Sequence, residues 1–116
     1  LVLINPNDEE KQPVDSMDEM KVRAEEKNYP FPYLKDVDKS VYKAYGATRT
    51  PEIFLLKNNG NGNIVVAYTG TVDDNYKDAS AVTVSYASDA VKALLQGESP
   101  NPASTVAIGC SIVAKN

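Results

Sequence analysis

Cys110 is the residue of this sequence best suited to covalent chemistry. It is the single cysteine of 116 residues, and histidine is absent. A cysteine thiolate attacks a disulfide or a sulfenic acid, so Cys110 could act as a resolving thiol. One cysteine excludes an internal disulfide, a CxxC pair and a zinc cage. The lack of histidine excludes the usual serine and cysteine hydrolase dyads and any imidazole metal site.

A structural role is the alternative for Cys110. Its neighbours in the sequence include alternating apolar residues, which are Val106, Ile108, Ile112 and Val113. Free cysteine packs as a small hydrophobe, so Cys110 could be buried among these residues. The residues alone leave both interpretations open.

Thr50 and Pro51 stand directly before an apolar stretch that is expected to form a strand. A proline there gives up a hydrogen-bond donor of the ladder, and X–Pro bonds are the only ones for which the cis form is cheap. The Thr50–Pro51 bond could therefore be cis, or the two residues could form an ordinary trans turn that enters the strand. Arg49 could favour a nearby thiolate, but we expect it simply to be exposed.

The acidic loop with Asp73, Asp74 and Asp78 could suggest a cation site. Its spacing does not match the calcium-loop pattern, and acidic loops are usually solvated. The Gly60-Asn61-Gly62 turn lacks the Gly-Lys-Ser/Thr of a phosphate-binding loop. We therefore expect no metal and no cofactor.

The charge balance argues against two classes of partner. Twelve basic and 16 acidic residues give a net charge of −4 and a pI near 4.7, so we expect neither nucleic acid nor an anionic membrane surface as a partner. The longest apolar runs are far shorter than the ~20 residues of a spanning helix. The N-terminus does not resemble a signal peptide and opens on an apolar run, which suggests a partial chain. One cysteine is compatible with the cytoplasm or the periplasm, so the compartment stays open.

The order of expected elements predicts one α/β domain over residues 1–116, with 98–116 as a C-terminal tail. Capping residues and Gly/Asn turns mark most of the element ends. The expected elements are a buried strand Leu1–Asn5, a helix from Ser16 to about Asn28, a short helix from Asp38 to Gly46, a hairpin of Ile53–Leu56 and Ile64–Tyr68, and a helix from Thr83 or Ser85 to Gly97, with Ala87, Ala90, Val91, Leu94 and Leu95 on one side.

Five segments carry a resemblance to a known family through their order and spacing. They are Phe31–Asp36, Ala44–Ala47, Thr50-Pro51, Gly70–Asn75 and Ile108–Ile112. Together they resemble the thioredoxin-like branch of the AhpC/TSA peroxiredoxin superfamily, whose members include redoxins and thiol-disulfide isomerases. The resemblance covers essentially the whole chain, although no single segment is specific.

The resemblance implies a thioredoxin-like three-layer fold and a thiol-dependent oxidoreductase, with Cys110, Thr50 and Pro51 at its site. It also implies that the Thr50–Pro51 bond is cis and positions a substrate and a thiol without transferring a proton. The substrate would be a peroxide or a disulfide, and a thiol would be the reductant. Family members carry a further strand and helix before the position of Leu1, with the attacking cysteine at the helix N-terminus, where a thiol pKa is lowered. This chain lacks that unit, and Arg49 stands where many relatives have a second cysteine. Whether the chain itself is an enzyme is therefore uncertain.

The missing strand would lie centrally, between Leu1–Asn5 and Ile53–Leu56. Unpaired strand edges invite association. We therefore expect self-association, a strand supplied by another chain, or direct pairing of the two edges. The alternative function is an inactive thioredoxin-like binding or scaffold module with a structural cysteine.

Overall fold

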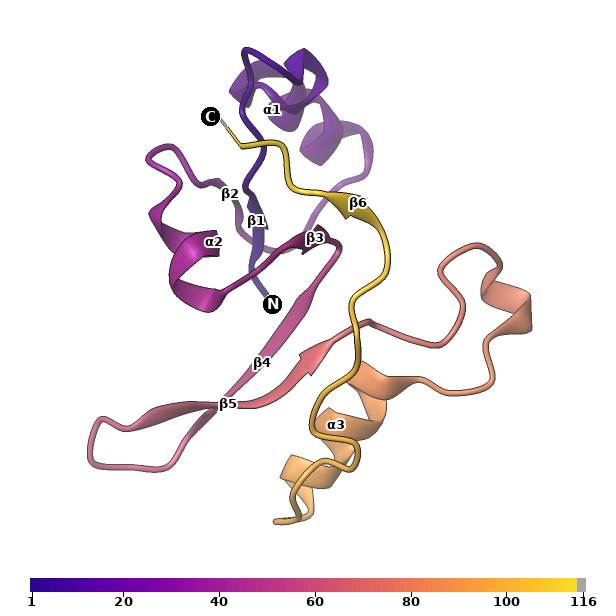
Figure 1. Ribbon diagram of the computed structural model, residues 1–116. Helices are drawn as coiled ribbons and strands as arrows, with labels where there is room; N and C mark the ends of the chain where they lie inside the picture. Colours follow the sequence, from indigo (N-terminus) through magenta and orange to yellow (C-terminus); the bar gives the residue numbers. More distant parts are fainter. Residues whose placement is uncertain (115–116) are drawn as a thin grey trace. The chain divides into compact units, whose positions relative to one another are not determined.

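The computed structural model describes residues 1–114, which form two compact units of mixed helix and strand (Figure 1). Unit 1 contains residues 1–48 and the C-terminal tail from Ser111, and unit 2 contains Arg49–Cys110. The elements in chain order are β1 (Leu3–Asn5), η1 (Pro13–Asp15), α1 (Met17–Glu26), β2 (Tyr33–Lys35), α2 (Ser40–Tyr45), β3 (Arg49–Thr50), β4 (Ile53–Asn58), β5 (Ile64–Gly70), η2 (Ala79–Ala81), α3 (Tyr86–Leu95) and β6 (Cys110–Ser111). The prediction of a single domain with a tail from residue 98 stays a prediction.

Unit 1 is built around a short parallel ladder that one helix covers. β1 pairs with β2, with Leu3 opposite Tyr33. α1 begins as the capping box predicts, because the Ser16 hydroxyl accepts a hydrogen bond from the Glu19 N–H at 3.3 Å. α1 packs against β2 and contributes the buried Met20. Arg23 of α1 donates to the Tyr33 hydroxyl at 2.7 Å, which joins helix and strand by a polar contact.

The start of α2 differs in part from the sequence prediction. Asp38 was expected to cap it, and its carboxylate accepts from the N–H and the hydroxyl of Ser40, the first residue of the helix. The buried Asp36 carboxylate accepts from the N–H groups of Val41 and Tyr42, at 3.2 and 2.8 Å. Asp36 therefore satisfies the second and third free donors of α2, while Gly46 ends the helix in the left-handed conformation as expected.

Unit 2 contains the predicted antiparallel hairpin. β4 pairs with β5, and the register shifts between Leu55 and Leu56. α3 packs on both strands, and the buried apolar side chains of this unit are Tyr68 and Ala90. The Tyr68 hydroxyl donates to the Thr71 carbonyl at 2.5 Å and forms a hydrogen bond with the Thr105 hydroxyl at 2.8 Å. This network holds the segment around Thr105 beside the end of β5.

One prediction about burial is wrong. The run Leu1–Asn5 was expected to be fully buried, but Leu1 is 82% exposed and Ile4 is half-exposed. The apolar side of α3 is also incompletely covered, because Leu95 is 82% exposed. The physical reason is the small size of the sheets. Each sheet has two strands, and the pairs are β1–β2, β3–β6 and β4–β5. A two-stranded sheet covers little apolar surface.

Among residues 1–114, no helix has the length and apolar character needed to cross a membrane.

Candidate functional site

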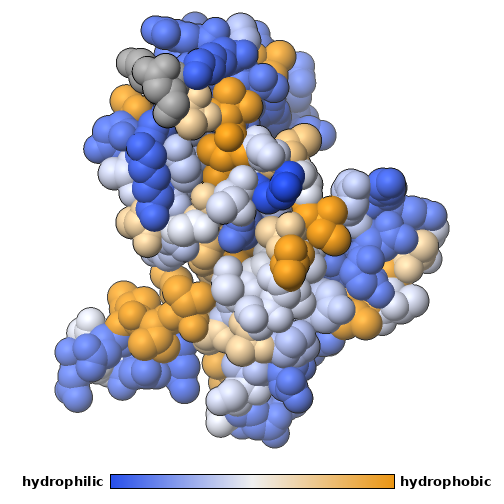
Figure 2. Space-filling model, viewed as in Figure 1, coloured by the Kyte–Doolittle hydropathy of each residue, from blue (hydrophilic) through white to orange (hydrophobic). Residues whose placement is uncertain are grey.

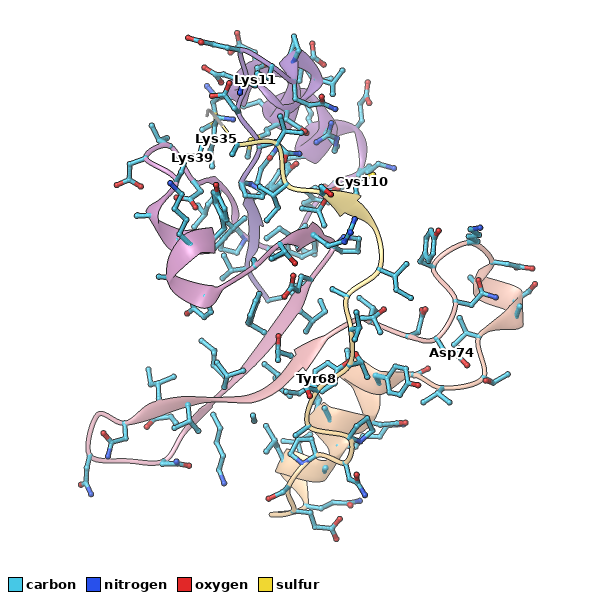
Figure 3. The ribbon with its side chains drawn as sticks, in the orientation of Figure 1. Lys11, Lys35, Lys39, Tyr68, Asp74 and Cys110 are labelled. Atoms are coloured by element: carbon cyan, nitrogen blue, oxygen red, sulfur yellow. The ribbon has the colours of Figure 1, made fainter. Side chains whose placement is uncertain are left out.

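Cys110 lies in an exposed strand next to the Thr50–Pro51 turn. It is the first residue of β6, which pairs with β3, and its side chain is free and exposed (Figure 3). The interpretation of Cys110 as a buried small hydrophobe is therefore wrong for the structure of this chain. The alternating Val106 and Ile108 do not enclose it, because both are themselves exposed.

Gly109 brings Cys110 against the Thr50–Pro51 turn. The Thr50–Pro51 bond is cis, as expected. Gly109 has a φ of +154°, and a Cβ there would lie 3.0 Å from the Thr50 carbonyl carbon and 3.4 Å from Pro51 Cδ. It would also overlap the Thr50 carbonyl oxygen. Only glycine allows this approach of the two backbones, so the structure brings together all three predicted site residues.

Arg49 supplies the positive charge of this site. Its side chain is exposed, as expected, and its guanidinium donates to the Gly109 carbonyl at 3.2 Å. The Arg49 N–H donates to Glu52 Oε1 at 3.3 Å. A fixed cation therefore lies beside the residue that precedes Cys110. Such a charge attracts anionic reagents.

Sequence reasoning missed the part that Gly109 plays. It was noted only as a member of the tail segment Ile108–Ile112, and its contact with Thr50 joins positions far apart in the chain. The available signal is a glycine directly before the only cysteine, since glycine often marks a close approach of two backbones.

The acidic loop after β5 has a structural role. Asp74 accepts hydrogen bonds from the N–H and the hydroxyl of Thr83, and these bonds lower the pKa of Asp74 below its ordinary value. Asp78 accepts in the same way from Ser80, whose hydroxyl and N–H lower the pKa of that carboxyl. Within residues 1–114, no group of three or more acidic, cysteine or histidine side chains could hold a metal ion.

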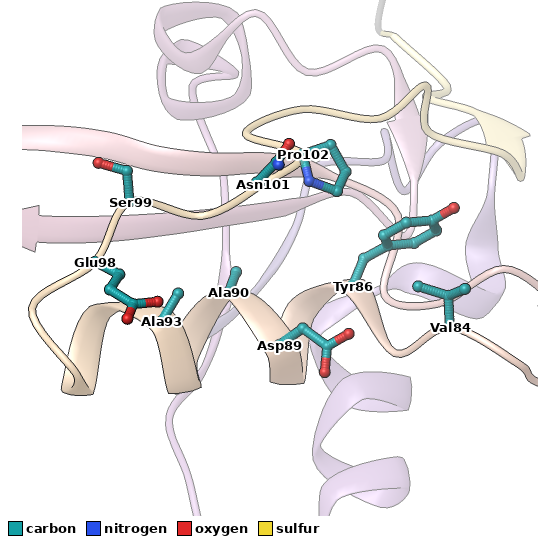
Figure 4. Close-up of a pocket in the computed structure, with 9 residues that line it drawn as sticks. All are labelled: Val84, Tyr86, Asp89, Ala90, Ala93, Glu98, Ser99, Asn101 and Pro102. Atoms are coloured by element: carbon teal, nitrogen blue, oxygen red, sulfur yellow. The ribbon is translucent and has the colours of Figure 1, made fainter.

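A cavity of about 200 Å³ lies in unit 2 between α3 and the segment that follows it (Figure 4). Tyr86 forms one side, and the small side chains of Ala90 and Ala93 form part of the wall. None of the predicted site residues lines it. It is lined by Val84, Tyr86, Asp89, Ala90, Ala93, Glu98, Ser99, Asn101 and Pro102.

Comparison with known proteins gives similar structures. No family model matches the chain, and no curated protein matches it. An uncharacterized conserved protein from Geobacillus kaustophilus is 39% identical, with a TM-score of 0.86 over 98% of this chain and 59% of its own. The hypothetical protein SMc02350 from Sinorhizobium meliloti 1021 is 33% identical, with a TM-score of 0.84 over 99% of this chain and 62% of its own. The chain thus spans about three fifths of the length of these two proteins.

Proposed function

We propose that this chain is part of a thioredoxin-like, peroxiredoxin-related oxidoreductase in which Cys110 is the resolving thiol. The observation that carries the proposal is the exposed Cys110 held against Thr50–Pro51 by the close approach of Gly109. The fold elements are compatible with it, since a parallel pair, an antiparallel hairpin and a helix on that hairpin occur in the order that the resemblance implies.

The proposed step forms one disulfide and conserves atoms and electrons. A cysteine outside these 116 residues, oxidised by a peroxide to a sulfenic acid, is attacked by the Cys110 thiolate. The S–S bond forms, and the sulfenic oxygen leaves as hydroxide, which takes up the thiol proton to give water. With a disulfide substrate, Cys110 instead attacks a mixed disulfide and releases the substrate thiolate. A thiol reductant then returns both cysteines to the reduced form.

Thr50, Pro51 and Arg49 have positioning roles in this proposal. The Thr50–Pro51 backbone faces Gly109 and fixes the direction in which Cys110 continues. The Arg49 guanidinium holds the Gly109 carbonyl and places a positive charge beside the backbone that leads into Cys110. None of these groups transfers a proton.

The first test compares the reaction of Cys110 with oxidised glutathione in the folded chain and in urea. A resolving thiol should form the mixed disulfide at least as fast in the folded chain as in the unfolded one, because the folded site exposes it. The C110S variant gives the background rate. A folded chain that reacts much more slowly than the unfolded one would instead favour an inactive binding module.

The second test uses protein expressed from the complete gene. Intact mass under non-reducing conditions should reveal a species heavier than the 12.6 kDa of this chain, with a disulfide to Cys110. If Cys110 stays reduced in that protein after treatment with peroxide and with a disulfide, the proposed function is wrong.

A further inference from the structure

The loop that joins β4 and β5 contains two asparagine–glycine pairs (Figure 1). They are Asn59-Gly60 and Asn61-Gly62, and all of these residues are exposed. An asparagine that precedes glycine loses its side-chain amide readily, because the next backbone nitrogen attacks the side-chain carbonyl carbon and glycine has no side chain to hinder that approach. The two pairs are alike in sequence but differ in their hydrogen bonds.

The first pair is held by hydrogen bonds on both of its residues. The Gly60 N–H donates to Asn58 Oδ1 at 2.9 Å, and the Asn59 N–H donates to the Asn63 carbonyl at 2.8 Å. The Gly60 carbonyl accepts from the Asn63 N–H at 3.0 Å. The nitrogen that would attack the Asn59 side chain must first lose its proton, and a hydrogen bond that engages this proton disfavours the loss.

The second pair forms the tip of the turn and is not held in this way. Asn61 and Gly62 have φ values of +54° and +77°. Positive φ at both central residues is typical of a type I′ hairpin turn. Among the residues that the structure describes, none accepts a hydrogen bond from the Gly62 N–H. A Cβ at Gly62 would meet no atom within 4 Å, so the tip has open space in which to rotate.

We propose that Asn61 is a site of spontaneous deamidation and that Asn59 is protected from it. The Gly62 nitrogen loses its proton to hydroxide and attacks Asn61 Cγ, once rotation of the pair brings the two atoms together. The new C–N bond closes a succinimide ring, and the side-chain nitrogen leaves as ammonia. Water then opens the ring at either carbonyl carbon and gives aspartate or isoaspartate, so the net change is water consumed and ammonia released.

The modification changes the tip of the hairpin. Either product adds a negative charge there, and isoaspartate also lengthens the main chain by one methylene group. The turn sets the register of a hairpin with so short a loop. Isoaspartate at position 61 should therefore loosen the pairing of Asn59 with Asn63.

The test is peptide mapping by mass spectrometry after incubation of the 116-residue chain at pH 8. Deamidation replaces an NH₂ group by OH, and fragmentation assigns this mass increase to one asparagine. In the folded chain, Asn61 should react at least threefold faster than Asn59. In urea the two rates should agree within twofold, because the hydrogen bond from Gly60 to Asn58 is lost and both asparagines precede glycine.

Two variants separate the contributions within the loop. N58A removes the acceptor of the Gly60 N–H and should speed the reaction of Asn59 at least twofold, while Asn61 reacts as before. N61Q should abolish the faster reaction, because glutamine would have to close a larger ring.

Three results would overturn the proposal. It is wrong if Asn59 reacts as fast as Asn61 in the folded chain, or if N58A leaves the rate of Asn59 unchanged. It is also wrong if Asn61 reacts in urea but stays intact in the folded chain, which would mean that the turn is too rigid for the ring to close. C110S should react like the wild type, so failure here and failure of the thiol chemistry are separate results.

Discussion

At the scale of single residues, the surroundings of Cys110 depend on two backbone contacts. Gly109 touches the Thr50 carbonyl, and the Gly109 carbonyl in turn accepts from the Arg49 guanidinium. The backbone that leads into Cys110 therefore has a guanidinium beside it. The charge should therefore govern which reagents reach the thiol.

Replacing this cation should change the selectivity of Cys110. R49M should slow the reaction with a dianionic aromatic disulfide by up to about tenfold at low salt, because electrostatic attraction of the reagent is lost. The reaction with a neutral dipyridyl disulfide should change little. High salt should reduce the difference, since it screens exposed charges. K57M, which removes an exposed lysine of β4, is the control, and equal slowing by K57M would contradict this account.

Asp74 gives a residue-scale prediction about pH. Hydrogen bonds from Thr83 lower its pKa from the ordinary value of 3.8. A lowered pKa in the folded state means that the folded chain binds the proton less well than the unfolded one. Its contribution to stability is thus complete above pH 3.8 and is lost as the pH falls through the folded pKa.

The expected effect is small, because Asp74 is exposed and solvent screens its interactions. Thermal unfolding of the wild type between pH 6 and pH 2 should show a loss of stability below pH 4 that is shallower in D74N. T83V removes the hydroxyl donor and should also make the loss of stability below pH 4 shallower. An identical loss of stability below pH 4 in all three proteins would show that the Asp74 carboxyl does not contribute to the pH dependence of stability.

At the scale of elements, two aspartates that are close in the sequence, Asp36 and Asp38, have different roles at the start of α2. Asp36 is buried and accepts from two N–H groups of α2, whereas Asp38 is exposed and accepts only from Ser40. D36A should lower the free energy of unfolding by about 1–2 kcal/mol, since two helix donors lose their acceptor. D38A should cost less than half of that. Urea unfolding measures both, and equal effects would show that Asp38 is the cap after all.

Features that depend on residues close together in the sequence were predictable. Features that depend on contacts between residues far apart in the sequence were not. The Ser16 cap, the hairpin and the Gly46 helix end follow from nearby residues and are confirmed. The capping role of Asp36 was missed because Asp38 stands at the usual spacing from the helix. The burial of Leu1–Asn5 was misjudged because an apolar run predicts a strand but not how many strands flank it. In the site, Thr50, Pro51 and Cys110 were predicted, whereas the hydrogen bond from Arg49 to Gly109 joins residues 60 positions apart.

At the scale of the whole molecule, little apolar surface is covered. Apart from two prolines, the buried apolar side chains of residues 1–114 are Met20, Tyr68 and Ala90. Figure 2 shows apolar residues gathered on the hairpin of β4 and β5, where Leu56, Ile64, Val65 and Val66 are all exposed. Consecutive strand residues point to opposite faces, so both faces of this hairpin are apolar. A two-stranded hairpin is marginally stable alone, and exposed edges pair readily with another chain.

We therefore expect the isolated chain to associate with a second copy through this hairpin. Analytical ultracentrifugation should show a mass that rises above 12.6 kDa with protein concentration. I64K should shift the equilibrium towards the monomer, because a lysine ammonium on an apolar interface loses its water without a partner. V72K is the matched control, since Val72 is exposed but lies outside the hairpin. A chain that stays monomeric at all concentrations, or that responds equally to both substitutions, would mean that the hairpin is not the surface of association. If a strand from a longer form of the protein covers the hairpin instead, that longer protein should be monomeric and I64K should destabilise it.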